Sequence, residues 1–221
     1  MSPSSPFLAW QLVDSAFPTG AFAHSWGLEA AWQHGEIGSV DALRPFVEAA
    51  ARQTAYGLVP LLNAAFDDPG RWRELDELAN AFLTNTVANR ASRQQGRTLL
   101  ATATRIWPSS DIDAIKAAST GLAVHLGPAS GVVFRQIGLS RATSEQVVLF
   151  GAVRGVLSAA VRLGIVGSYE AQRLQRECAA WLDELSEICA DLDAADLVQV
   201  APIPDMLQAT HDRLYSRLFQ S

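Results

Sequence analysis

The sequence is poor in charged residues and has almost no lysine. Charged side chains make up 18% of its 221 residues, against about a quarter in a typical soluble domain, and Lys116 is the only lysine. The formal net charge of −6 argues against general attraction to the phosphates of nucleic acids. Because 49% of the residues are hydrophobic, we expect a large core and some apolar surface that a partner or a second copy covers.

Cysteine is nearly absent as well. Cys178 and Cys189 are the only two, eleven residues apart in one helical pattern, which places them about 16 Å apart along a helix axis. A disulfide needs Cα atoms within about 7 Å of each other, so we expect two free thiols and a reduced, cytoplasmic setting. Residues 1–6 lack the basic start of a signal peptide.

A long hydrophobic run without charge is missing too. The most apolar stretch, residues 147–166, contains Arg154 and Arg162. Each arginine would cost about 2.5 kcal/mol or more at the centre of a bilayer. We therefore predict that this stretch is the central buried helix of a bundle and does not span a membrane.

Strand signals are scarce, whereas helical periodicity runs along the whole chain. The sequence predicts an all-α fold, a single compact bundle of about ten helices, with residues 1–6 as a flexible N-terminal segment, residues 7–221 as one domain and residues 205–221 as its C-terminal helix and tail. The helices are expected at residues 7–16, 28–34, 40–66 with an interruption at Pro60, 70–82, 86–106, 111–126, 129–137 and 168–191. Two further helices are expected to begin at a capping box over residues 143–146 and at a cap at Asp205.

Catalytic and metal-binding motifs are also missing. The histidines, His24, His34, His125 and His211, are scattered and match no HExxH or Cys-x-x-Cys pattern. We expect no metal ion and no cofactor bound by one chain alone, although a site assembled from two protomers stays open. The sequence has no Walker A loop, no GxGxxG motif and no GxSxG elbow.

One enzymatic alternative can be built from Ser25, His24 and Glu29, as the site of a small helical hydrolase. Neighbouring residues on a helix point about 100° apart, however, so His24 is badly placed to act as the base for Ser25. Hydrogen bonding of Ser25 to the backbone near a helix start is the simpler interpretation. The residues favour a helical interaction protein over an enzyme.

The two ends of the chain have an unusual composition. Residues 17–29 read FPTGAFAHSWGLE, and residues 211–221 read HDRLYSRLFQS. Chain ends usually fray and carry unremarkable polar residues, whereas these are rich in aromatic, arginine and leucine side chains. We predict that both ends are held, by each other or by a partner.

Five stretches resemble the UreF family of urease accessory proteins. They follow one another along nearly the whole chain in the order expected for that family. Together with the chain length and the all-α prediction, they identify the sequence as a member of that family. The stretches are residues 17–29, 91–97 (ASRQQGR), 125–128 (HLGP) with Gly131, 160–164 (AVRLG) leading to 171–172, and 214–219 (LYSRLF).

The resemblance implies a cytoplasmic, non-enzymatic protein that works as a homodimer. It would bind UreD, also called UreH, and recruit and regulate the GTPase UreG, so that nickel reaches apo-urease. Nickel would then be cargo that transits the complex, and family members have an internal water-filled path for it. Both chain ends become ordered against UreD in this family.

The resemblance also implies that residues 205–221 are a partner-binding helix and tail, with partner-binding residues at both chain ends: Phe22, His24, Ser25, Glu29, Tyr215, Arg217, Leu218 and Phe219. Family members often have a tyrosine where Phe22 stands, and its hydroxyl can bond the tail arginine. Without that hydroxyl, Arg217 is expected to stack on the Phe22 ring or to find a carboxylate or carbonyl. Tyr215, Leu218 and Phe219 would be apolar anchors, with packing inside the chain's own core as the alternative.

Overall fold

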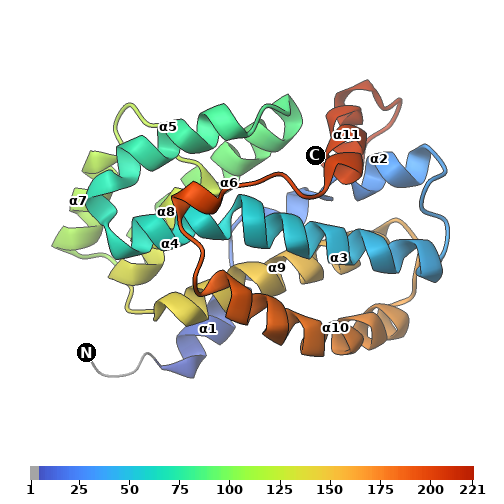
Figure 1. Cartoon of the computed structure of the whole chain (residues 1–221), viewed down its shortest axis with the longest axis horizontal. Coiled ribbons are helices and arrows are strands. Elements are labelled where there is room, and N and C mark those ends of the chain that lie inside the picture. The colour runs from blue at the N-terminus through green and yellow to red at the C-terminus, as the bar shows by residue number, and fades with distance from the viewer. Residues whose placement is uncertain (1–4) are drawn as a thin grey trace.

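The structure is a computed structural model that describes residues 5–221, and it confirms the all-α fold. The predicted flexible segment 1–6 lies outside the described residues except for Ser5 and Pro6, which begin the first helix. Figure 1 shows a bundle without strands in the described part of the chain. Its α-helices are α1 (Pro6–Val13), α2 (Leu28–Gln33), α3 (Val40–Gly57), α4 (Val59–Asp67), α5 (Trp72–Phe82), α6 (Thr86–Ile106), α7 (Ser110–Ala118), α8 (Leu126–Gln136), α9 (Arg141–Arg162), α10 (Ser168–Cys189) and α11 (Pro202–Ala209), joined by 3-10 turns η1 (Ala21–Ala23), η2 (Pro69–Arg71), η3 (Ala194–Asp196) and η4 (His211–Arg213).

Helix α9 is the central helix of the bundle, as the sequence predicts. It packs against α1, α3, α4, α8 and α10, and Figure 1 shows it crossing behind α3 and α10. Among the described helices it alone is long and apolar enough to cross a membrane by length and composition, but half of that apolar window is buried in the bundle. Its arginines are used inside the molecule, since Arg154 donates to the carbonyl of Val13 and Arg162 to the carbonyl of Phe22.

The core has two parts that meet around α9. One lies between α3, α9 and α10 and includes Leu43, Phe46 and Leu157. The other lies between α4, α5, α6 and α8 and includes Leu62 and Leu75. Cys178 and Cys189 are buried free thiols on α10, as predicted.

Glycines allow three helices to approach each other at backbone distance. A Cβ atom at Gly131 of α8 would overlap the carbonyl oxygen of Leu62 on α4, and one at Gly96 of α6 would overlap the carbonyl oxygen of Val124. Only glycine leaves room for such contacts. The position of α8 is therefore fixed against both α4 and α6.

The prediction of a helix over residues 111–126 is wrong for its second half. Helix α7 ends at Ala118 instead of continuing to residue 126, and the backbone turns left-handed at Gly121 and Val124. The buried carboxylate of Asp76 on α5 accepts the N–H groups of residues 123–125 at 2.7 to 3.2 Å. These bonds replace the helical ones, so Gly127 and Pro128 lie in the first turn of α8 rather than after a helix.

Several predicted helix starts are also displaced. Ser140, not residue 143, caps α9, because its hydroxyl accepts the N–H of Thr143. Glu145 therefore lies inside α9 and is buried rather than closing a capping box. Helix α11 begins at Pro202 instead of after Asp205, since proline suits a first turn where no N–H is needed. By contrast α6 spans residues 86–106 as predicted, with Asn85 as its cap.

Candidate partner-binding site

The loop between α1 and α2 carries the aromatic and polar signature of the N-terminal end. Gly20 and Gly27 have φ angles of +74° and +84°, which favour glycine. A Cβ atom at Gly27 would lie 2.9 Å from the Cβ of Gln208 on α11. The loop therefore brings the start of α2 directly against the C-terminal part of the chain.

The tail, residues 214–221, runs without helical structure back across this loop. The N–H of Ser25 donates to the carbonyl of Ser221 at 2.6 Å, and the N–H of Gln220 donates to the carbonyl of Ala23 at 2.7 Å. The Ser25 hydroxyl donates to the same Ser221 carbonyl at 2.7 Å. Of the two predicted arrangements, the ends are held by each other in this structure.

Glu29 on α2 holds the tail through hydrogen bonds from the tail backbone to its carboxylate. Its side chain is only 2% exposed and accepts the N–H of Leu218 at 2.6 Å and the N–H of Phe219 at 3.1 Å. The ring of His211 lies 3.1 Å from the same carboxylate through its Nε2 atom. One buried acid thus satisfies two backbone donors that have no helix or strand partner.

His24 is buried beside the end of the tail. Its Nδ1 atom shares a 2.6 Å hydrogen bond with the Ser221 hydroxyl, whereas its Nε2 atom is buried without a partner in the described residues. Burial, together with the nearby Arg90 and His211, lowers the pKa of His24 to about 4. The imidazole is therefore neutral near pH 7.

This geometry removes the basis for the hydrolase alternative. His24 and Ser25 each bond to Ser221 instead of to each other. The Ser25 hydroxyl is fully buried and already donates to a carbonyl, and Glu29 holds the tail rather than orienting His24. No nucleophile with a base within reach is present at these positions.

The two predicted arrangements for Arg217 have different outcomes. Arg217 pairs with the carboxylate of Asp212 at 3.2 Å, so the prediction that it finds a carboxylate is confirmed. Stacking of Arg217 on Phe22 is wrong, because Arg162 of α9 occupies that position. Its guanidinium carbon lies 4.0 Å from the ring centre of Phe22 and 4.1 Å from that of Phe219.

Sequence reasoning missed this role of Arg162, although the residue lies in the family-like stretch at 160–164. It also donates a 2.6 Å hydrogen bond to the carbonyl of Phe22. A guanidinium between two aromatic rings is a favourable cation–π arrangement. Arg162 therefore ties the N-terminal loop and the tail to the central helix.

The predicted partner-binding residues divide into a buried and an exposed set. His24, Ser25, Glu29 and Phe219 are buried, and we call these four residues the clamp. Tyr215 is fully exposed, while Phe22 and Leu218 are 64% and 53% exposed. Phe7 and Trp10 of α1 are exposed aromatics as well.

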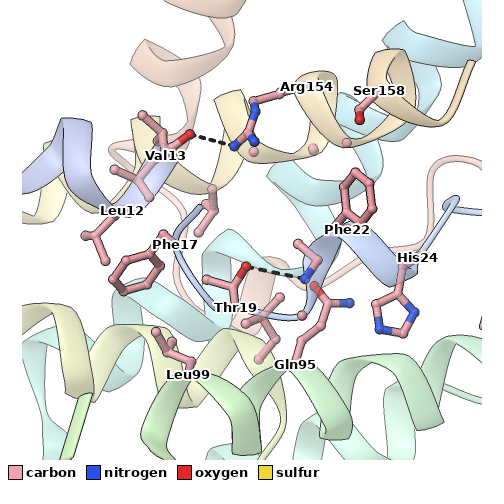
Figure 2. A pocket seen from close by; sticks show the side chains of 18 of the residues that line it. Leu12, Val13, Phe17, Thr19, Phe22, His24, Gln95, Leu99, Arg154 and Ser158 are labelled. Atoms are coloured by element: carbon pink, nitrogen blue, oxygen red, sulfur yellow. Dashed lines mark hydrogen bonds between the residues drawn. The ribbon is translucent and has the colours of Figure 1, made fainter. Parts of the chain in front are cut away.

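A cavity of about 340 Å³ lies between α1, the N-terminal loop, α6, α8 and α9. Figure 2 shows Leu12, Phe17 and Leu99 toward one side of the cavity and His24 and Gln95 toward the other. Arg154 and Phe22 also line it. Its walls are mostly apolar, with a few polar groups.

A second cavity of about 120 Å³ adjoins the first. It is lined by His125, Ser92 and Ser221, among others. Burial is the main cause that lowers the pKa of His125. In the described residues, no group of three or more His, Cys, Asp or Glu side chains is arranged to hold a metal ion.

Comparisons with known proteins show the family. The UreF family profile matches residues 37–179. Over 218 residues, the chain is 37% identical to urease accessory protein F of Arabidopsis thaliana, covering 96% of this chain and 91% of the relative. It is 35% identical over 225 residues to urease accessory protein F of Oryza sativa subsp. indica, covering 99% and 86%.

A bacterial relative, urease accessory protein UreF of Arthrobacter sp. (strain FB24), is 31% identical over 214 residues, covering 96% of this chain and 95% of the relative. The alignment with the rice relative covers 99% of this chain and so includes the N-terminal loop and most of the tail, which lie outside the profile match. All three are accessory proteins by name, in agreement with the prediction that this chain is not an enzyme. The chain belongs to the UreF family of urease accessory proteins.

Proposed function

We propose that this chain is the scaffold of a urease-maturation complex in the cytoplasm. It pairs as a homodimer, binds UreD (UreH) through its two joined ends, and recruits and regulates the GTPase UreG. Nickel carried by the complex is thereby delivered to apo-urease. Family membership supports this proposal together with the arrangement of the chain ends.

The observation that carries the proposal is the exposed apolar surface formed where the ends meet. Phe22, Tyr215 and Leu218 project outward around a buried clamp that fixes their backbone. Exposed aromatic and aliphatic side chains on a rigid base are typical of protein-binding sites. We call these three residues the joined-end surface and assign it to UreD.

The clamp residues have a different part in this proposal. The four clamp residues are buried and fix the backbone that carries the joined-end surface, so they need not touch UreD themselves. They are His24, Ser25, Glu29 and Phe219. Arg217 lies at its edge, half exposed and paired with Asp212, which Arg90 also holds through two bonds of 2.8 and 2.9 Å. Exposed ion pairs contribute little to stability, so Arg217 is free to exchange its partner when UreD binds.

The adjoining cavities support a route for the nickel cargo. Six residues line both cavities, so the two spaces lie next to each other inside the bundle. The six are His24, Trp26, Thr54, Leu58, Gln95 and Leu126. Because Phe22 lines the larger cavity and Ser221 lines the smaller one, a cargo passing through this interior would travel past the joined ends of the chain.

Co-purification with UreD and UreG tests the proposal. Leu218→Arg, Tyr215→Ala and Arg217→Ala should each weaken UreD capture, the first by about tenfold or more because it places a charge in an apolar contact. The matched control is Tyr169→Ala on α10, which removes an exposed aromatic side chain from a helix outside the two chain ends.

Circular dichroism confirms that each variant is folded, and light scattering after size-exclusion chromatography measures the expected dimer. Normal UreD capture and urease activation by the folded Leu218→Arg protein would rule out the joined-end surface as the UreD site. A chain that stays monomeric, alone and with both partners, would contradict the homodimer.

A further inference from the structure

The larger cavity has mostly apolar walls and a solvent opening. Leu12, Phe17 and Leu99 bound one side of its space of about 340 Å³. Ligand sites in proteins typically have about 300 to 1,000 Å³, apolar walls and a few polar groups that fix the orientation of the ligand. The exposed loop residues Ser15 and Ala16 also line the cavity, so a small molecule can enter there from solvent.

Helix α9 contributes hydrogen-bond donors to this cavity. Arg154 and Ser158 both line it, and residues four positions apart lie on the same face of a helix. Figure 2 shows Arg154 reaching toward Val13 at the upper edge of the cavity, with Ser158 on the same helix. Within the described chain, Arg154 donates through Nη1 to the carbonyl of Val13. Its other N–H groups and the Ser158 hydroxyl have no hydrogen-bond partner among those residues.

The positive charge along this wall has no counter-charge within the described chain. Arg162, two turns after Arg154 on α9, also lines the cavity, and neither arginine forms an ion pair with a described acidic side chain. Asp14 is the only acidic residue of the lining, and its carboxylate accepts the N–H of Ala16 at 2.7 Å. A charge beside an apolar interior is costly unless it has a partner. The missing partner is therefore an anion.

We infer that the larger cavity binds a small amphipathic carboxylate, an anion with a hydrocarbon part. Its carboxylate accepts hydrogen bonds from the guanidinium of Arg154 and from the Ser158 hydroxyl. Its hydrocarbon part lies against Leu12, Phe17 and Leu99. A guanidinium presents paired N–H groups that match the two oxygens of a carboxylate, and the hydrocarbon part removes apolar wall from water.

Other small ligands use only part of this site. An uncharged apolar molecule fills the space but leaves the donors of Arg154 without an acceptor. A small inorganic anion satisfies Arg154 but leaves the apolar walls in contact with water. Since the chain carries a net charge of −6, general electrostatic attraction does not bring anions to it, and binding at this position has to come from the local contacts.

Calorimetric titration of the full chain with sodium octanoate at pH 7.5 tests the inference. Octan-1-ol keeps the hydrocarbon part without the charge, and inorganic phosphate keeps a charge without the hydrocarbon part. Octanoate should bind about tenfold or more tightly than either, because octanol lacks the charge-assisted hydrogen bonds and phosphate lacks the apolar contact. Undetectable octanoate binding, or equal affinities for octanoate and octanol, would overturn the inference.

Substitution of Arg154 tests its role in recognising the charge. Arg154→Met keeps the length of the side chain, so it should weaken octanoate binding about tenfold and leave octanol binding unchanged. Arg154→Lys restores a positive charge and should regain part of the octanoate affinity. Arg52→Met, which changes an exposed arginine on α3 outside both cavities, is the matched control. Wild-type octanoate affinity in folded Arg154→Met would contradict the assigned position of the carboxylate.

Filling the cavity tests the position of the hydrocarbon part without changing a charge. Gly151 lines the cavity, and a Cβ atom there meets nothing within 4 Å, so Gly151→Leu should fold and block both octanoate and octanol. Ala142→Leu, at an exposed position of the same helix outside the cavity, should bind like wild type. Octanoate binding that persists in folded Gly151→Leu would overturn the inference. None of these titrations involves UreD, UreG or nickel, so their outcome is separate from that of the proposed function.

Discussion

Two buried carboxylates hold the irregular parts of this chain. Glu29 accepts the N–H groups of Leu218 and Phe219, and Asp76 accepts three consecutive N–H groups before α8. Backbone donors outside helices need such partners when they are buried. Each acid therefore determines the path of a segment far from it in sequence.

Glu29→Ala should release the tail. It leaves the donors of Leu218, Phe219 and His211 buried without an acceptor, and each costs about 1 to 3 kcal/mol. We expect a loss of about 3 kcal/mol or more in urea unfolding and rapid chymotrypsin cleavage at Tyr215. Glu36→Ala, an exposed acid near the end of α2, is the matched control and should change neither. A protease-resistant tail in Glu29→Ala would show that the clamp does not depend on this acid.

Burial of His125 should make stability depend on pH. Its pKa is lowered in the folded chain from the ordinary 6.5, so below pH 6.5 the unfolded chain binds more protons and the free energy of unfolding falls as pH decreases. The slope from one such group approaches about 1.4 kcal/mol per pH unit. Urea unfolding of wild type and His125→Gln between pH 7.5 and 5 measures it, and the variant should show the shallower slope. Parallel pH profiles would contradict the neutral, buried state of His125.

The sequence indicated several of these side chains without indicating what they touch. His24, Ser25 and Glu29 stand out by residue type, yet their bonds to the tail span 182 to 197 residues. A single sequence contains no signal for pairing at such separations. Arg162 was overlooked for the same reason, because an arginine in an apolar helix gives no sign that two aromatic rings from opposite ends enclose it.

Helical glycines occur both where the surrounding atoms leave room for a side chain and where they do not. A Cβ atom at Gly151 of α9 meets nothing within 4 Å, whereas one at Gly131 of α8 would overlap α4 backbone. Gly151→Ala should stabilise the protein by about 0.5 to 1 kcal/mol, since alanine is the better helix former. Gly131→Ala should cost about 2 kcal/mol or more through overpacking. Thermal and urea unfolding compare the two, and equal effects would contradict the close approach of α8 to α4.

Helix existence was predictable, whereas several helix ends were not. The bounds of α6 follow from its periodicity and its asparagine cap, which are local signals. The early end of α7 depends on Asp76, which lies on another helix, so local periodicity alone extended α7 too far. Likewise the apparent capping box at 143–146 competes with Ser140, and only the packed structure buries Glu145.

For the molecule as a whole, the tail adds stability but no helix. Deleting residues 214–221 removes Phe219 from the core and takes away two of the donors to the Glu29 carboxylate, at a cost of about 3 kcal/mol or more. None of the deleted residues is helical, so the circular dichroism signal at 222 nm should persist while the urea midpoint falls. A collapse of helical signal at zero denaturant would show that the bundle cannot fold without its tail.

The joined-end surface has a consequence for how its binding partner distinguishes one state of the chain from another. Phe22 and Leu218 are 196 positions apart in sequence, and both are held on the folded surface by the bonds that join the two chain ends. An unfolded or misfolded copy contains the same side chains but does not hold the two chain ends together. A partner that must contact Phe22 and Leu218 at the same time therefore binds only the folded chain. Unfolded copies do not enter the complex, and no separate quality-control step is needed to exclude them.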